Sequence, residues 1–309
     1  MTRFAAAILL AGLAGSVIRP AAAQEEVPPP RIIHAGLLEA TELEEVSGLA
    51  PSGLRSDVFW ALPDSGNPPD LFAVGLDGSH RGRFTVVGVT NRDWEDIDSF
   101  LLEGQPCLLI ADTGDNEGRD PQYSLHIVRE PPIPPGRAPV KGAVAVLRTI
   151  LFVFEDGPRD CEAVAVDPAG ETVYLLSKRD VPPVLYTLPL APTGDVAVLT
   201  ARRLTEVPHI PRPTAQDLSE DRQYGRYRSQ VTAMDFAPDG SSAAVLTYKC
   251  AYRFPRAPEE SWADAFQRVP ETLPLPRLRQ AESLCYSRDG QALYITSEQR
   301  PCPLLRLEP

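Results

Sequence analysis

The chain has 309 residues, with 30 Lys and Arg against 42 Asp and Glu and a net charge of −12. This acidic balance argues against nucleic-acid binding, which needs clustered Lys and Arg to neutralise phosphates. The 33 prolines argue against a mostly helical fold but suit strand edges and loops, and the five cysteines are too few for a disulfide framework.

Residues 1–23 read as a secretory signal. Arg3 supplies the basic start, residues 5–15 (AAAILLAGLAG) the apolar core, and the three alanines before Gln24 a small-residue cleavage site. The apolar run is too short for a membrane span. We therefore expect an exported, periplasmic or extracellular protein, in which residues 24–30 (QEEVPPP) are a disordered leader and residues 31–309 form one domain.

Short apolar runs then alternate with turns, and no long helical period interrupts them. Turn signals such as Asp77-Gly78, Asp239-Gly240 and Asp289-Gly290 separate the runs, which is typical of antiparallel hairpins. The sequence therefore predicts an all-β fold. The strand candidates, in chain order, are residues 58–62, 71–76, 82–89, 107–111, 123–128, 172–177, 184–188, 243–248 and 292–296.

Five stretches repeat one pattern, in which a polar residue, a strand, a turn and a second strand are followed by another polar residue 16 or 17 positions later. The pattern is plainest in residues 162–178 (EAVAVDPAGETVYLLSK) and 282–298 (ESLCYSRDGQALYITSE). Repetition of one supersecondary unit favours a β-propeller, with blades of four strands around a central channel. The five pairs are Ser47/Asp64, Glu95/Asp112, Glu162/Lys178, Thr232/Lys249 and Glu282/Glu298.

The repeats predict a single propeller of five four-stranded blades. Residues 282–309 are too few for four strands, so residues 31–40 (RIIHAGLLEA) are expected to supply the missing outer strand and close the ring. A sixth blade within residues 196–230 is the alternative. Cys250 and Cys302 follow the second strands of neighbouring repeats and could face each other, although sequence alone does not determine disulfide pairing.

Propeller geometry brings the start of each first strand and the end of each second strand to one rim of the channel. Converging glutamates repel one another unless a cation, a shared proton or a basic neighbour offsets their charge. Oxygen ligands suit calcium or magnesium, and a mixed acidic and basic rim suits a small polar or anionic ligand. The alternative is that these residues only cap the blade ends. The expected metal ligands are Glu95, Asp96, Asp112, Asp115, Glu162 and Glu282; the expected ligand-binding residues are Ser47, Asp64, Lys178, Arg179, Thr232, Lys249 and Glu298.

Other catalytic signatures are absent from the sequence. It contains no Gly-rich phosphate loop, no HExxH and no GxSxG motif, and none of its four histidines recurs at the expected rim. A Ser/His/Asp hydrolase is therefore not expected. Metal-driven or carboxylate-driven chemistry is the enzymatic route that remains, and no particular residue is selected as catalytic.

Eight segments spread along the chain carry a family resemblance: EVSGLA (45–50), DSG (64–66), NRDWEDI (91–97), ADTGDN (111–116), DGPRDCEA (156–163), SKRD (177–180), VTAMDFAPDG (231–240) and QAESL (280–284). Together they resemble a family of exported bacterial β-propeller proteins, mostly uncharacterised and loosely grouped with phytase-like propellers. The resemblance covers about residues 45–300. It implies calcium-assisted phosphomonoester hydrolysis, with Glu95, Asp96, Asp112, Asp115, Glu162 and Glu282 at the acidic channel mouth. The chain departs from the family at Gln280-Ala281-Glu282, where Gly commonly precedes the Glu.

These observations lead to one main expectation and one alternative. The main expectation is an exported monomeric propeller whose rim binds a divalent cation, with Ca²⁺ as the candidate, and a small polar or anionic ligand; phosphoester hydrolysis extends it. The alternative is a non-catalytic scaffold that binds a ligand or a protein through the same face. Neither requires nucleic acid or a membrane span.

Overall fold

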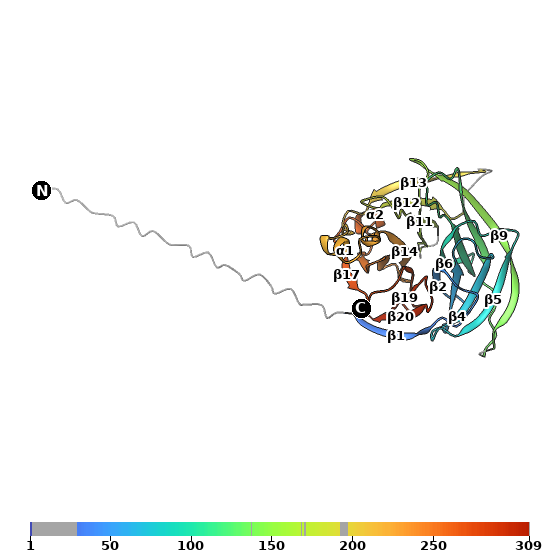
Figure 1. Cartoon of the computed structure of the whole chain (residues 1–309). Helices are drawn as coiled ribbons and strands as arrows, with labels where there is room; N and C mark the ends of the chain where they lie inside the picture. Colours follow the sequence, from blue (N-terminus) through green and yellow to red (C-terminus); the bar gives the residue numbers. More distant parts are fainter. Residues whose placement is uncertain (2–29, 137, 168, 170, 192–196, 309) are drawn as a thin grey trace.

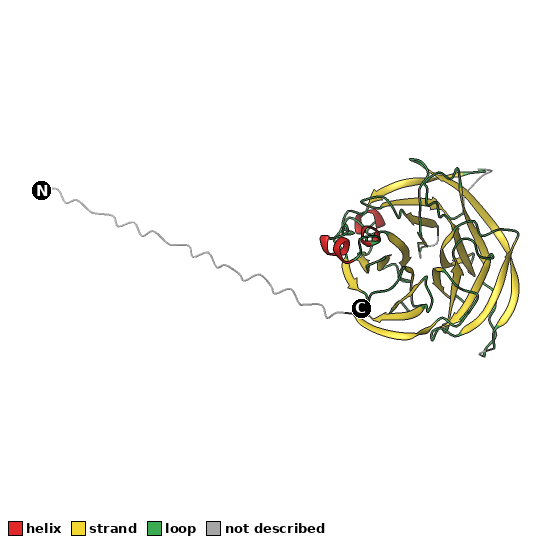
Figure 2. Cartoon of the chain, viewed as in Figure 1, coloured by secondary structure: helices red, strands yellow, loops and turns green. Residues whose placement is uncertain are grey.

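The computed structural model describes Met1 and residues 30–136, 138–167, 169, 171–191 and 197–308. This part of the chain is mostly β, as predicted, and its helices are short (Figure 2). Apart from Met1 and Pro30, the predicted signal (1–23) and leader (24–30) lie outside the described residues. No helix within the described ranges has the length and apolar character needed to cross a bilayer.

The described strands form five units, each with four antiparallel strands. Unit 1 contains β2 (Val46–Pro51), β3 (Val58–Pro63), β4 (Asp70–Gly75) and β5 (His80–Val87). Unit 2 contains β6 (Trp94–Leu102), β7 (Gln105–Asp112), β8 (Tyr123–Arg129) and β9 (Val140–Phe154). Unit 3 contains β10 (Ala163–Val166), β11 (Thr172–Leu176), β12 (Val184–Pro189) and β13 (Leu199–Glu206). Unit 4 contains β14 (Val231–Phe236), β15 (Ser242–Thr247), β16 (Cys250–Pro255) and β17 (Glu271–Pro274). Unit 5 contains β18 (Ala281–Tyr286), β19 (Leu293–Ser297), β20 (Pro303–Glu308) and β1 (Arg31–Leu37).

The first strands of the units follow one another in a circle. Strand β2 contacts β6, β6 contacts β10, β10 contacts β14, β14 contacts β18, and β18 contacts β2 again. Figure 1 shows β2, β6 and β14 near the centre, with β1, β5, β9, β13 and β17 around the outside. Each unit therefore runs from the centre outwards.

The N-terminal strand completes unit 5. Strand β1 pairs antiparallel with β20, from Arg31 opposite Glu308 to Leu37 opposite Pro303. This is the role predicted for residues 31–40, and it covers an edge of β20 that would otherwise be open. Residues 197–230 add no sixth four-stranded unit: they contain β13, the short helix α1 (Ala215–Glu220) and the turn η1 (Gly225–Tyr227).

The long strand β9 makes connections that the sequence did not predict. Its first half pairs parallel with β5, beginning at Gly82 opposite Val140, while its second half pairs antiparallel with β8 and parallel with β13. These pairings join units 1, 2 and 3 into one twelve-stranded sheet. The outer edges of these three units therefore hold each other in place.

Buried aspartates connect the first strands of neighbouring units. The carboxylate of Asp96 in β6 accepts a hydrogen bond from the Val164 amide in β10 at 2.9 Å, and Asp98 accepts one from Val166 at 2.6 Å. Asp235 in β14 accepts one from the Tyr286 amide in β18 at 2.7 Å. Because these first strands do not pair with each other through their backbones, the side chains satisfy amides that would otherwise lack a partner.

Apolar side chains fill the spaces between units, and the cysteines belong to this core. Phe59 of unit 1 packs on Tyr294 of unit 5 with ring centroids 4.5 Å apart. All five cysteines are buried and unpaired, so Cys250 and Cys302 do not form the bridge that their sequence positions allowed.

Short helix α2 (Trp262–Ala265) lies between β16 and β17 and also contributes to this packing. Its Trp262 ring lies 4.2 Å from that of Phe236 in unit 4. Packing between the units therefore fixes the relative positions of their first hairpins.

Candidate functional site

One backbone hydrogen bond recurs at the end of the first hairpin in four units. In each case the amide after the second strand donates to a carbonyl just before the first strand, which identifies equivalent positions. The four bonds are Asp64 to Glu45 (2.9 Å), Thr113 to Asp93 (3.2 Å), Lys178 to Asp160 (3.1 Å) and Glu298 to Gln280 (2.9 Å). In unit 4, Val231 pairs with Thr247, so the next residue, Tyr248, takes this place.

In two of the five predicted pairs, the second residue is therefore displaced by one position. The sequence comparison selected Asp112 and Lys249, whereas Thr113 and Tyr248 occupy the equivalent places. Asp112 instead accepts a hydrogen bond from the Asp93 amide at 2.9 Å, and Lys249 pairs with Asp217 of α1 at 2.8 Å. Since side chains alternate between the two faces of a strand, one position of error changes where a side chain points.

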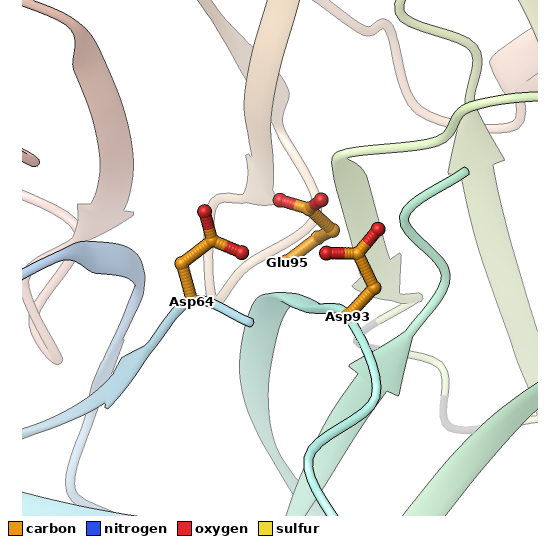
Figure 3. Close-up of side chains that lie close together, drawn as sticks. All are labelled: Asp64, Asp93 and Glu95. Carbon is orange, nitrogen blue, oxygen red and sulfur yellow. The ribbon is translucent and has the colours of Figure 1, made fainter. Parts of the chain in front are cut away.

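Five carboxylates gather where units 1, 2 and 3 meet. We call Asp64, Asp93, Glu95, Asp160 and Glu162 the acidic cluster. In the first triad, Asp64, Asp93 and Glu95 each offer an oxygen within 4.8 Å of the others; Glu95, Asp160 and Glu162 form a second triad by the same measure. Glu95 belongs to both triads. Figure 3 shows the carboxylates of the first triad turned toward one another.

Two basic side chains from the end of the β10–β11 hairpin enter the second triad. The Lys178 ammonium forms a buried ion pair with Glu162, and the Arg179 guanidinium pairs with Asp160 at 2.6 Å. The Lys178 Nζ atom also lies 5.3 Å from the centre of the Tyr248 ring, a separation at which an ammonium is attracted to an aromatic ring.

Two further predicted acids, Glu282 and Glu298, belong to unit 5 and lie next to Tyr248 of unit 4 or next to each other. The Tyr248 hydroxyl donates to Glu282 at 2.7 Å. Glu298 is hydrogen-bonded to Glu282 and also accepts a bond from the Gln280 side-chain amide. Glu282 and Glu298 therefore form a hydrogen-bonded carboxyl pair outside both triads.

Burial and mutual repulsion change the protonation of the acidic cluster. Burial, reinforced by the charge of Asp64, raises the pKa of Asp93 to about 6. Burial raises the pKa of Glu162 to about 8 despite the opposing ammonium of Lys178. The pKa of Glu95 lies well above its ordinary value because of burial and then repulsion from Glu162. Without a cation, the cluster therefore retains protons near neutral pH.

Ser47 and Thr232 position the glutamates of the next unit. The Ser47 hydroxyl donates to the carbonyl of Trp94 at 2.8 Å, and Thr232 donates to the carbonyl of Ala281 at 2.7 Å. These carbonyls immediately precede Glu95 and Glu282 in the sequence. Both hydroxyls thus donate to the backbone of the next unit, and the ligand-binding role of these two residues stays a prediction.

Two predicted metal ligands also lie outside the triads. The carboxylate of Asp96 accepts hydrogen bonds from the amides of Ile97 and Val164, both at 2.9 Å. Asp115 accepts bonds from the Arg119 amide at 3.0 Å and the Tyr123 hydroxyl at 2.8 Å. With Asp112 also outside both triads, the structure brings together Glu95 and Glu162 from the predicted metal set, with Asp64, Lys178 and Arg179 from the predicted ligand-binding set.

Sequence reasoning did not select three residues that the structure places here: Asp93, Asp160 and Tyr248. The sequence does contain a signal for the first two, because each lies two positions before a glutamate that begins one of the five pairs, in Asp93-Trp94-Glu95 and Asp160-Cys161-Glu162. Neither a scan against models of known protein families nor a search of curated proteins gave a match to this chain. Its chemistry must therefore be argued from the cluster itself.

Proposed function

We propose that this chain is an exported β-propeller whose acidic cluster binds one divalent cation, with calcium as the candidate, and holds a small polar or anionic ligand beside it. The five units with their first strands in a circle support a five-bladed propeller, and residues 1–23 support export to the periplasm or outside the cell. The proposal retains the resemblance to exported bacterial, loosely phytase-like propellers.

The observation that carries the proposal is the first triad, Asp64, Asp93 and Glu95. Its oxygens lie within 4.8 Å of one another, and in the described part of the chain no Lys or Arg forms an ion pair with any of the three. Three buried or half-buried carboxylates without a direct ion-pair partner are costly. The charges of Lys178 and Arg92 act on them from a greater distance. Calcium takes several oxygen ligands at about 2.3–2.6 Å, so a cation would relieve this cost.

Gly114 makes the close approach of these carboxylates possible. A Cβ atom at this position would collide with the carboxylates of both Asp93 and Glu95. The loop after β7 therefore passes directly beside the triad without contributing a side chain. This leaves the oxygens of both residues free to turn toward a common point, as Figure 3 shows.

A ligand beside the cation would meet a mixed surface. Arg179 is partly exposed, with 38% of its side chain accessible, and guanidinium groups match the oxygens of carboxylate and phosphate. Phosphoester hydrolysis extends the proposal, because a divalent cation can polarise a phosphoryl oxygen. A non-catalytic binding scaffold is the second candidate. It is favoured by the pairing of Lys178 and Arg179 with Glu162 and Asp160, because both basic side chains are already engaged by carboxylates of the chain itself.

Calcium titration tests the proposal directly. Isothermal titration calorimetry should show one calcium bound by the wild type and a loss of binding in Glu95→Gln and Asp64→Asn. Asp289→Asn, in an exposed turn of unit 5, is the matched control and should bind as the wild type does. The absence of calcium binding by the folded wild type would refute the proposal.

A phosphatase screen separates the two candidate functions. Turnover of p-nitrophenyl phosphate that disappears on chelation and in Glu95→Gln favours the enzyme. Calcium binding without turnover of a panel of phosphomonoesters favours the scaffold.

A further inference from the structure

The two triads differ in one respect: the second is already neutralised by the chain itself. Lys178 pairs with Glu162, and both side chains are 7% accessible. Arg179 pairs with Asp160, whose side chain is 1% accessible. Two of the three carboxylates in this triad therefore have a positive partner, and the third, Glu95, is shared with the first triad.

Lys178 occupies a place where a metal ion could otherwise lie. Its ammonium contacts a carboxylate of the second triad and lies near the ring of Tyr248. Long amine side chains can bring a single positive charge into such a position while the stem packs against its surroundings. By contrast, the described residues place no basic side chain within ion-pair distance of Asp64 or Asp93.

We propose that Lys178 is a built-in counter-ion that replaces a second metal ion and limits the acidic cluster to one divalent cation. This inference rests on the proposed cation binding at the first triad. Two divalent ions sharing Glu95 would repel strongly at the short separation that two adjoining triads allow. One divalent ion, with the charges of Lys178 and Arg179, leaves the five carboxylates close to balanced.

The test is the number of calcium ions bound when the ammonium is removed. Lys178→Met retains a long apolar stem and leaves Glu162 without its partner. Calorimetry and equilibrium dialysis should show this variant binding one calcium more than the wild type. Lys249→Met is the matched control, because Lys249 pairs with Asp217 outside the cluster, and its calcium count should equal that of the wild type.

The difference between variant and wild type decides this inference, whereas the wild-type count alone decides the proposed function. A count of one in Lys178→Met and none in the wild type would support the counter-ion role and refute native calcium binding. An unchanged count in folded Lys178→Met, checked by circular dichroism, would overturn the counter-ion role.

A second variant does not depend on the stability of Lys178→Met. Glu162→Gln/Lys178→Met removes the carboxylate and the ammonium together, so the net charge of the site is preserved. It should bind the same number of calcium ions as the wild type, because Glu162 is engaged by Lys178 rather than by the metal. Loss of a wild-type calcium site in this double variant would place Glu162 among the ligands and overturn the inference.

Discussion

Replacing Asp93 with Asn should have opposite effects on stability with and without calcium. In the metal-free protein, Asp93 is ionised at pH 7.5, although burial and then repulsion from Asp64 raise its pKa from 3.8 to about 6. At about 1.4 kcal/mol per pKa unit this corresponds to about 3 kcal/mol. Solvent around the half-buried side chain reduces the effect to about 1–2 kcal/mol. Asp93→Asn should remove this cost and raise the Tm of the chelated protein by roughly 2–8 °C.

The pH dependence follows from the direction of the pKa shift. Because the folded protein binds the Asp93 proton more tightly than the unfolded chain, the wild type loses stability as the pH rises from about 4 to about 6. The advantage of Asp93→Asn should therefore be nearly absent at pH 4 and complete above pH 7. Differential scanning calorimetry in EDTA at both pH values measures this.

Calcium should reverse the order of stability. A ligand at a hundred times its Kd stabilises the folded state by about 2.7 kcal/mol, and only the wild type retains all three carboxylates of the first triad. The wild type should then melt above Asp93→Asn. The reasoning is refuted if Asp93→Asn is less stable than the wild type in EDTA at pH 7.5, or if its advantage is the same at pH 4. Asp289→Asn should show neither effect.

Three further predictions follow from the same contacts. Gly114→Ala should weaken calcium binding at least about tenfold, a cost of about 1.4 kcal/mol, because the new Cβ collides with the carboxylates of Asp93 and Glu95. Calorimetry measures the affinity, and an unchanged affinity would contradict this prediction. Asp96→Ala should lower the free energy of unfolding by about 1–3 kcal/mol, since the buried Val164 amide loses its acceptor. Urea unfolding measures this change. The Asp96→Ala variant should bind the same number of calcium ions as the wild type. Calcium affinity should fall as the pH is lowered from 7.5 to 5, by up to about tenfold per pH unit for each proton displaced, whereas a flat profile over this range would argue against Asp93 and Glu95 as ligands.

Hairpin length is the feature that limited prediction of the site. Alternating strands and turns were enough to predict the all-β fold, the starts of the first strands and the pairing of residues 31–40 with the last unit. However, the number of residues between the start and the end of the first hairpin varies. It is 18 from Glu95 to Thr113 and 16 from Thr232 to Tyr248. A comparison that preferred charged residues chose Asp112 and Lys249, one position away in each case.

Contacts between units could not be predicted from the sequence of a single repeat either. Asp96 belongs to an acidic motif and was expected at the rim, yet its carboxylate lies against the backbone of β10. Whether an acid faces the next strand or the rim depends on which side of β6 it occupies. Strand β9 likewise pairs with β5, β8 and β13, and no local pattern in its sequence specifies three partners.

The acidic cluster lies where units 1, 2 and 3 meet, and the residues two positions before the first member of each pair help to explain this. These are Glu45, Asp93, Asp160, Gln230 and Gln280, which are acidic in units 1 to 3 and neutral amides in units 4 and 5. Two of these extra carboxylates, Asp93 and Asp160, lie beside Glu95. Glu282 is repelled first by Glu162 and then by Glu298, and it is hydrogen-bonded to Glu298 and to Tyr248. A cation is expected at the acidic cluster, and the pair of Glu282 and Glu298, which can share protons, is suited to the polar part of a ligand.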